Sequence, residues 1–370
     1  MDAAKTVLIM AGGTGGHVFP GLALAAELRL RGFGVAWLGT RAGIEYRLVP
    51  EADIGLQLID VEGIRGRGIK ALLKAPLVIL RAVLQSRKII KELKPGLVVG
   101  LGGFVAGPGG VAAKICGIPL VIHEQNAVAG TTNRLLAHFA DRVLTAFPKV
   151  IAGGECIGNP VREAFFSRKQ PASIDGEIKI LVVGGSRGAR AINALVPRAL
   201  AKLGDEKKYV AVCHQAGEAL IDETTDCYRQ VAISLNVEGV DSLRGGDVKL
   251  VPFIEEMERH FHWADVVICR AGALTVSELA ASGTASILIP LPHAIDNHQL
   301  ENAKYLRDVG AAKVCEQAAL SADMLANIIK SFLDDPKNIN TMSEKALLCS
   351  KPQAVRDFAD VCEREYQSAQ

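Results

Sequence analysis

Short apolar runs that pass into glycine clusters, and then into amphipathic stretches, recur along this chain. The apolar runs are residues 6–10, 97–99, 180–183 and 266–269. Runs of this length without polar alternation are typical of strands buried on both faces of a parallel sheet. The helices that follow them are expected to extend to Leu30, Cys116, the region of Leu200, and Ser282. Strand, loop and helix in alternation predict an α/β fold.

Two of these units resemble each other. TVLIMAGGTGG and KILVVGGSRGA each end a strand in a glycine pair, a hydroxyl residue and further small residues. We expect two Rossmann-like domains of the GT-B type, with parallel sheets facing a central cleft, because ligands in such sheets bind beyond the carboxyl ends of the strands. The expected domains are residues 1–160 and 161–349, and a helix within 350–370 is expected to pack back on the first domain.

The composition of the chain disfavours several classes of protein. A length of 370 residues with 49% hydrophobic residues suits two domains, and a formal net charge of +2 indicates no nucleic-acid partner. The 8 cysteines include no CxxC pair, which disfavours a zinc or redox motif and favours a reducing compartment. The N-terminus does not read as a signal peptide, and no apolar run reaches the ~18–20 residues that would span a bilayer.

The glycine clusters at 12–16 and 184–188 are candidate anion sites. Backbone N–H groups approach a phosphate closely where no Cβ intervenes, and a helix N-terminus adds unpaired donors. Tight strand-to-helix packing is the alternative reason for such glycines. NAD binding is disfavoured, because the second strand ends in Gly39-Thr40 with no carboxylate. A Walker lysine is also absent.

A carboxylate does occur in the sequence GALTVSE, which places Glu278 on the first turns of a helix. There it could accept two hydrogen bonds from a ribose diol, or it could cap its own helix.

Six ordered blocks, spread over nearly the whole chain, resemble one family of GT-B glycosyltransferases. The blocks are AGGTGGHVFPGLALA, LGGFVAGPGG, HEQNAVAGTTNRLLA, GNPVR, VVGGSRGARAIN and RAGALTVSELAASG. The family consists of the N-acetylglucosaminyltransferases that act late in peptidoglycan synthesis. The resemblance implies transfer of N-acetylglucosamine, with inversion, from UDP-N-acetylglucosamine to the undecaprenyl-linked acceptor lipid I. It implies neither a cofactor nor a metal in the cleft, and a location at the cytoplasmic face of the bacterial inner membrane.

The resemblance also assigns roles to residues of this sequence. It places Thr14, Gly15 and Gly16 in the first glycine loop and Asn126 on the donor. It places Arg162 and Ser186 near the diphosphate, Ile254 at the uracil, and Gln299 or its neighbour His298 at the donor sugar, with Gln299 favoured. The uridine-binding helix would comprise Ala273, Leu274, Thr275, Val276, Ser277 and Glu278.

His17 is the first candidate for the general base, because it follows the glycine loop at a helix start that disfavours the imidazolium. It could instead hydrogen-bond the loop or an acceptor phosphate. Glu124 is the second candidate, and could equally brace the HEQN loop. His260 and His262 flank Phe261 and do not read as a metal pair.

Residues 68–81 are unusually apolar yet dotted with cations, which suits an interfacial helix on anionic lipid. Ile69, Lys70, Leu72 and Leu73 are the expected contacts, and Pro76 is expected to open a new helix. An ordinary helix buried on the first sheet is the alternative. Other functions compatible with the pattern are a UDP-sugar epimerase, a transferase for another lipid, a catalytically silent nucleotide-binding membrane adaptor and, more distantly, an NAD oxidoreductase.

Overall fold

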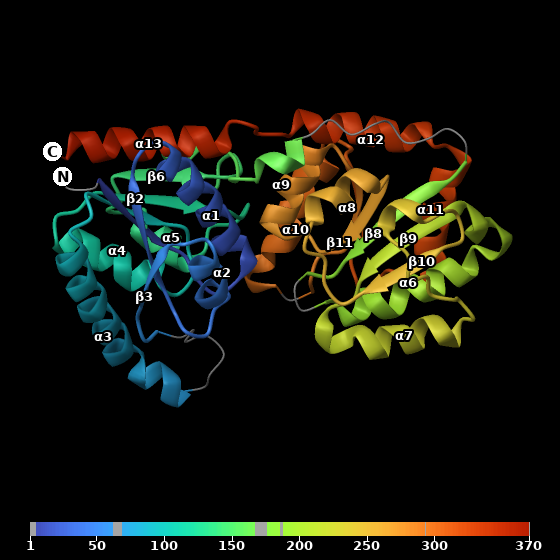
Figure 1. Ribbon diagram of the computed structural model, residues 1–370, viewed down its shortest axis with the longest axis horizontal. Coiled ribbons are helices and arrows are strands. Elements are labelled where there is room, and N and C mark those ends of the chain that lie inside the picture. Colours follow the sequence, from blue (N-terminus) through green and yellow to red (C-terminus); the bar gives the residue numbers. More distant parts are fainter. Residues whose placement is uncertain (1–4, 62–68, 167–175, 186–187, 293, 370) are drawn as a thin grey trace. The chain divides into compact units, whose positions relative to one another are not determined.

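The computed structural model describes residues 5–61, 69–166, 176–185, 188–292 and 294–369, without the side chains of 69–74 and 295. The chain divides into two compact units (Figure 1). Unit 1 comprises Met1–Arg162 together with Lys351–Gln370, and unit 2 comprises Glu163–Ser350.

Unit 1 contains a seven-stranded sheet in the order β3-β2-β1-β4-β5-β6-β7, and every pair is parallel. Its strands are β1 (Thr6–Met10), β2 (Gly34–Gly39), β3 (Gly55–Leu58), β4 (Leu97–Gly100), β5 (Leu120–Glu124), β6 (Arg142–Thr145) and β7 (Glu155–Cys156). Its helices are α1 (Gly15–Leu30), α2 (Glu45–Glu51), α3 (Ile69–Leu93), α4 (Ala106–Ile115), α5 (Thr131–Leu136) and α13 (Ala354–Ser368).

Unit 2 contains a six-stranded parallel sheet in the order β10-β9-β8-β11-β12-β13. Its strands are β8 (Ile178–Val183), β9 (Val210–Gln215), β10 (Val248–Val251), β11 (Val266–Cys269), β12 (Ala285–Leu288) and β13 (Ala312–Val314). Its helices are α6 (Arg190–Lys202), α7 (Ile221–Gln230), α8 (Met257–Trp263), α9 (Ala273–Ser282), α10 (His298–Arg307), α11 (Ala322–Asp334) and α12 (Lys337–Leu348). The expectation of two Rossmann-like parallel-sheet domains is confirmed.

The side chains of β1 alternate between two cores. Val7 and Ile9 pack with α1 and α13 on one face of the sheet, whereas Leu8 and Met10 pack with α3 and α4 on the other. Both faces are therefore covered, which is why the strands read as unbroken apolar runs. Met10 lies opposite both Leu38 and Gly100, so that three neighbouring strands end together and bring their loops to one edge.

The expectation that Pro76 opens a new helix is wrong. Pro76 lies inside α3, which runs continuously from Ile69 to Leu93. A proline removes one backbone hydrogen bond from a helix, but packing of the following turns against the sheet and α4, through Ala82, Val83 and Ile90, offsets that loss. Among the described residues, no helix is long and apolar enough to cross a membrane.

The C-terminal helix α13 completes the core of unit 1. Phe358 is fully buried and its ring stacks on the imidazole of His123, with centroids 5.2 Å apart. We expect Phe358→Ala to destabilise unit 1 by about 3–5 kcal/mol, the usual cost of removing a buried phenylalanine side chain.

The two tryptophans allow this prediction to be checked. Trp37 lies in unit 1 and Trp263 in unit 2, so in a Trp263→Phe background fluorescence during urea unfolding reports on unit 1 alone. Arg364→Ala, at an exposed position of the same helix, is the control and should change stability by no more than about 0.5 kcal/mol. Equal stability of the Phe358→Ala variant would contradict the role of α13 in this core.

Candidate active site

The first glycine loop of unit 1 connects β1 to α1 and holds His17. Thr14 stands at the N-cap of α1, and its hydroxyl lies 3.3 Å from Nδ1 of His17. The backbone amides of His17 and Val18 both donate to the Thr14 carbonyl. The imidazole therefore sits on the first turn of the helix, directly beside the loop.

The loop after β4 packs directly on this first loop. A Cβ on Gly102 would lie 2.7 Å from Cδ2 of His17, and one on Gly103 would lie 2.4 Å from the Gly12 carbonyl oxygen. Both glycines have positive φ angles, of 96° and 79°. These two positions require glycine for close approach as well as for backbone conformation. Gly102 thus forms one wall against the His17 ring.

Glu124 ends β5 and is buried, with both carboxylate oxygens engaged. Oε1 accepts from the amide and the side chain of Asn126, at 3.0 and 3.2 Å. Oε2 accepts from the Gly130 amide at 3.0 Å and from the Asn133 side chain at 2.8 Å. The carboxylate closes the 124–133 segment into a rigid loop, as the bracing alternative expects.

His123, next to Glu124, lies inside the core. Its Nε2 pairs with the Gly158 carbonyl oxygen at 2.9 Å, and burial lowers the pKa of His123 to about 4. The neutral imidazole ties β5 to the chain segment that ends unit 1. His123 is therefore a buried part of the core next to the loop that Glu124 closes.

Unit 2 contains a cavity of about 480 Å³ at the carboxyl ends of its strands. β8, β11 and β12 end together there, because Cys269 pairs with both Val183 and Leu288. The cavity is lined by Val183, Gly184, Gly185, Gly188, Ala189, Arg190, Ala191, Cys269, Arg270, Gly272, Thr275, Leu291, Pro292, Gln299 and Gln317. It includes the N-termini of α6 and α9, whose helix dipoles favour an anion.

Arg270 supplies a cation to this cavity. Its guanidinium donates to the carbonyl oxygens of Ile289 and Pro290, at 3.0 and 3.2 Å, and to Oε1 of Gln317 at 2.6 Å. Burial lowers the pKa of Arg270, yet a guanidinium stays charged at physiological pH. The arrangement can hold a diphosphate between a fixed cation and two helix N-termini.

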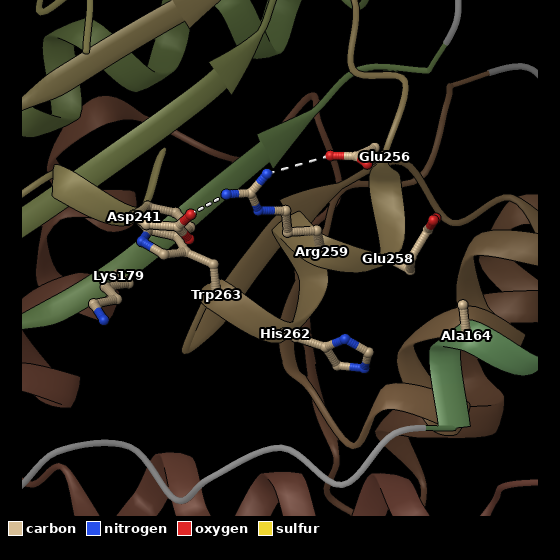
Figure 2. A pocket seen from close by; sticks show the side chains of 8 residues that line it. All are labelled: Ala164, Lys179, Asp241, Glu256, Glu258, Arg259, His262 and Trp263. Carbon is tan, nitrogen blue, oxygen red and sulfur yellow. Dashed lines mark hydrogen bonds and ion pairs between the residues drawn. The ribbon is translucent and has the colours of Figure 1, made fainter. Parts of the chain in front are cut away.

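A larger hollow of about 750 Å³ lies elsewhere in unit 2 (Figure 2). Its wall includes Lys179 near the start of β8 and Trp263 at the end of α8, so it lies at the amino-terminal edge of the sheet. Arg259 pairs there with Asp241 and Glu256. Ligands of doubly wound sheets bind at the opposite edge, so we do not assign this hollow to the reaction.

Comparisons with known proteins decide the family. Residues 7–145 match the Glycosyltransferase family 28 N-terminal domain, and residues 179–361 match the Glycosyltransferase family 28 C-terminal domain. The chain is 49% identical, over 97% of both chains, to the UDP-N-acetylglucosamine–N-acetylmuramyl-(pentapeptide) pyrophosphoryl-undecaprenol N-acetylglucosamine transferase of Pseudomonas putida (strain W619). The chain belongs to glycosyltransferase family 28.

Solved structures agree with this assignment. The crystal structure of MurG from Acinetobacter baumannii is 38% identical, with a TM-score of 0.80, covering 97% of this chain and 99% of that one. A putative UDP-N-acetylglucosamine 2-epimerase from Listeria monocytogenes matches with a TM-score of 0.69 but only 12% identity, which shows the fold alone.

The structure places the residues that the family resemblance assigned to the donor in different surroundings. Thr275 and Gln299 line the cavity, and Oε1 of Gln299 accepts from the Leu291 amide at 2.9 Å. Ala273, Leu274, Val276 and Ile254 are buried, so contact with a ligand through the Val276 side chain would need a rearrangement. Ser186 lies outside the described residues.

The remaining residues assigned to the donor are not among those that line the cavity. Ser277 donates to the Ala273 carbonyl within α9, and Glu278 follows it on the same helix. Arg162 is exposed at the end of unit 1, and Asn126 is tied to Glu124. His260 and His262 bind backbone carbonyls, of Glu256 and Phe165, and no metal-binding group of side chains occurs among the described residues.

Sequence reasoning missed Arg270 and Gln317. Arg270 directly follows the buried strand at 266–269, and a charge at the carboxyl end of such a strand was the available signal. Gln317 had no signal, because only the sheet brings the segment after β13 to the Arg270 side chain.

Because His123 is buried, the stability of unit 1 should depend on pH. Its folded pKa of about 4 lies below the ordinary value of 6.5, so the unfolded chain binds more protons between these values. Stability is full above pH 6.5 and falls as the pH drops through this window. Between pH 6.5 and 5, unit 1 should lose about 1.5 kcal/mol through His123. Urea titrations read out by Trp37 fluorescence measure this, and His123→Gln should flatten the slope.

Proposed function

We propose that this chain transfers N-acetylglucosamine from UDP-N-acetylglucosamine to undecaprenyl-pyrophosphoryl-N-acetylmuramyl-pentapeptide, lipid I, and so forms lipid II. The observation that carries the proposal is the 49% identity, over nearly all of both chains, to a transferase whose name states this reaction. Both domains of family 28 are present, the N-terminal one over residues 7–145 and the C-terminal one over residues 179–361.

The donor is proposed to occupy the cavity of unit 2. Its diphosphate would lie between Arg270 and the amides at the starts of α6 and α9. When the bond between the sugar and UDP breaks, negative charge grows on the β-phosphate, and fixed donors stabilise it without reorganisation. Uridine would lie along the start of α9, with Glu278 accepting from its ribose hydroxyls.

His17 is proposed to take the proton of the acceptor hydroxyl as that oxygen forms its bond to the sugar. Its position at the N-terminus of α1 disfavours the imidazolium in the ground state. Glu124 is the weaker candidate, because its carboxylate already accepts four hydrogen bonds from its own loop. Its expected role is to hold Asn126.

Membrane association is proposed to involve α3. The side chains of Ile69, Lys70, Leu72 and Leu73, which the sequence singled out, lie outside the described residues. Further along the same helix, Leu77, Leu80 and Leu84 are 66%, 54% and 54% exposed. Their spacing places them on one helical face, with Arg81 and Lys88 also exposed. An apolar face with cations beside it suits anionic lipid at the cytoplasmic surface of the inner membrane.

Turnover distinguishes this function from its alternatives. Purified protein, UDP-N-acetylglucosamine and a lipid I analogue should release UDP at a rate that depends on the acceptor. Acceptor-independent conversion of the UDP-sugar would indicate an epimerase, and UDP binding without turnover would indicate an adaptor. Either result would refute the proposal.

The proposed roles predict different kinetic effects. His17→Ala should lower kcat by about 100–10,000-fold, the usual contribution of a general base. Glu278→Ala should chiefly raise the donor KM, because it removes a contact made in the ground state as well. Steady-state kinetics with both substrates varied measures both parameters. Near-normal kcat in His17→Ala would place the base elsewhere.

The proposed contact of α3 with lipid predicts that a charge on its exposed apolar face weakens membrane binding. Leu80→Glu should weaken binding to anionic phospholipid vesicles by about 10–150-fold, since a buried leucine contributes roughly 1.5–3 kcal/mol. Co-sedimentation measures the effect. Leu30→Glu, at an 83% exposed leucine on α1, is the matched control and should bind like the unchanged protein. Equal losses in the two variants would refute a specific α3 contact.

A further inference from the structure

The first glycine loop encloses a carboxylate that belongs to the protein itself. Glu45, the first residue of α2, is fully buried in unit 1. Its Oε2 accepts from the Gly13 amide at 2.9 Å. Its Oε1 accepts from the amide and the hydroxyl of Thr40, at 3.0 and 2.9 Å. One side chain therefore ties the loop after β1 to the loop after β2.

Three glycines make room for this side chain. A Cβ on Gly12 would lie 2.7 Å from Oε1 of Glu45, and one on Gly43 would lie 1.9 Å from Oε2. A Cβ on Gly39 would lie 2.7 Å from Cγ. Contacts below about 3 Å are not tolerated, so each of these positions must be glycine for the carboxylate to fit. The missing Cβ atoms therefore leave room for a carboxylate of the protein itself.

This geometry limits the capacity of the first glycine loop to bind an anion from outside the protein. Oriented backbone amides in glycine loops attract anions, and at Gly13 that capacity is already used. A buried charge is kept only where hydrogen bonds replace its hydration, as the three donors do here. The loop in unit 2 differs, because its glycines line an open cavity.

The Glu45 carboxylate is coupled to the reacting end of unit 1. Gly13, which it holds at a φ of 95°, immediately precedes Thr14. The Thr14 hydroxyl lies 3.3 Å from Nδ1 of His17, and Gly102 packs on the other side of that ring. A shift of the Gly13 peptide would therefore move Thr14, and with it the hydroxyl beside the imidazole.

We propose that Glu45 is a positioning residue for the transfer reaction, an internal anion that occupies the first glycine loop and sets the orientation of Thr14 and His17. The proposal rests on the proposed function.

Glu45→Gln is the test, because it keeps the volume but turns one acceptor into a donor. One of the amides of Gly13 and Thr40 would then face an N–H group. We expect kcat to fall by about 10–100-fold, as misplacement of a catalytic group by about 1 Å can cost, with the KM for UDP-N-acetylglucosamine nearly unchanged. Glu51→Gln, at an exposed position on the same helix, makes the same change of charge and should leave both parameters unchanged.

A raised donor KM at normal kcat would overturn the proposal, because it would make the first loop a donor site. Normal values of both would overturn it too. If Glu45→Gln yields no soluble protein, Thr40→Val removes a single donor and should still lower kcat several-fold at an unchanged KM. Unchanged kcat in Thr40→Val would then overturn the proposal.

A second readout does not need turnover. In protein labelled with ¹³C-histidine, the His17 ring signal, assigned by its loss in His17→Gln, should shift in Glu45→Gln and stay in place in Glu51→Gln. The His214 signal in unit 2 should stay in place in both variants. An unshifted His17 signal would overturn the proposal even if the unchanged protein transferred sugar. Failure of that protein to release UDP would instead refute the proposed function.

Discussion

The structure depends on close approach of backbone to backbone at the carboxyl ends of parallel strands. In unit 1 the Gly103 Cα lies against the Gly12 carbonyl, and Gly102 lies against the His17 ring. Because β1, β2 and β4 end in register, their loops must share one small volume. Only residues without Cβ atoms allow that packing, and the positions of His17, Thr14 and Glu45 follow from it.

The glycine loops that follow the first strand of each unit have different surroundings. In unit 1 the Gly13 amide of the loop donates to the buried carboxylate of Glu45, so this donor is used within the protein. In unit 2 Gly184, Gly185 and Gly188 border a cavity to which Arg270 and two helix N-termini contribute positive charge. A similar motif therefore surrounds a carboxylate of the protein itself in one unit and borders an open cavity in the other.

Buried polar side chains beneath the loops hold them in place. In unit 1 His123 links β5 to Gly158 and stacks on Phe358 of α13, while Glu124 closes its own loop. In unit 2 His214 pairs with Asn193 of α6 and Tyr228 of α7, at 3.1 and 2.8 Å, and burial lowers its pKa to about 3. Both histidines are neutral at physiological pH, since burial disfavours the charged ring. Such networks orient surface loops that their own packing would leave loose.

The sequence by itself determined the α/β class, the two Rossmann-like units and the glycine-rich loops that join strand to helix. These features depend on local periodicity and on glycine, whose meaning is readable within a few residues. Only the tertiary structure decided that α3 continues through Pro76, that Gln317 meets Arg270, and that Glu45 fills the loop around Gly13. Each of these depends on contacts between segments far apart in the chain, and a sheet creates those neighbours only after its strands have paired.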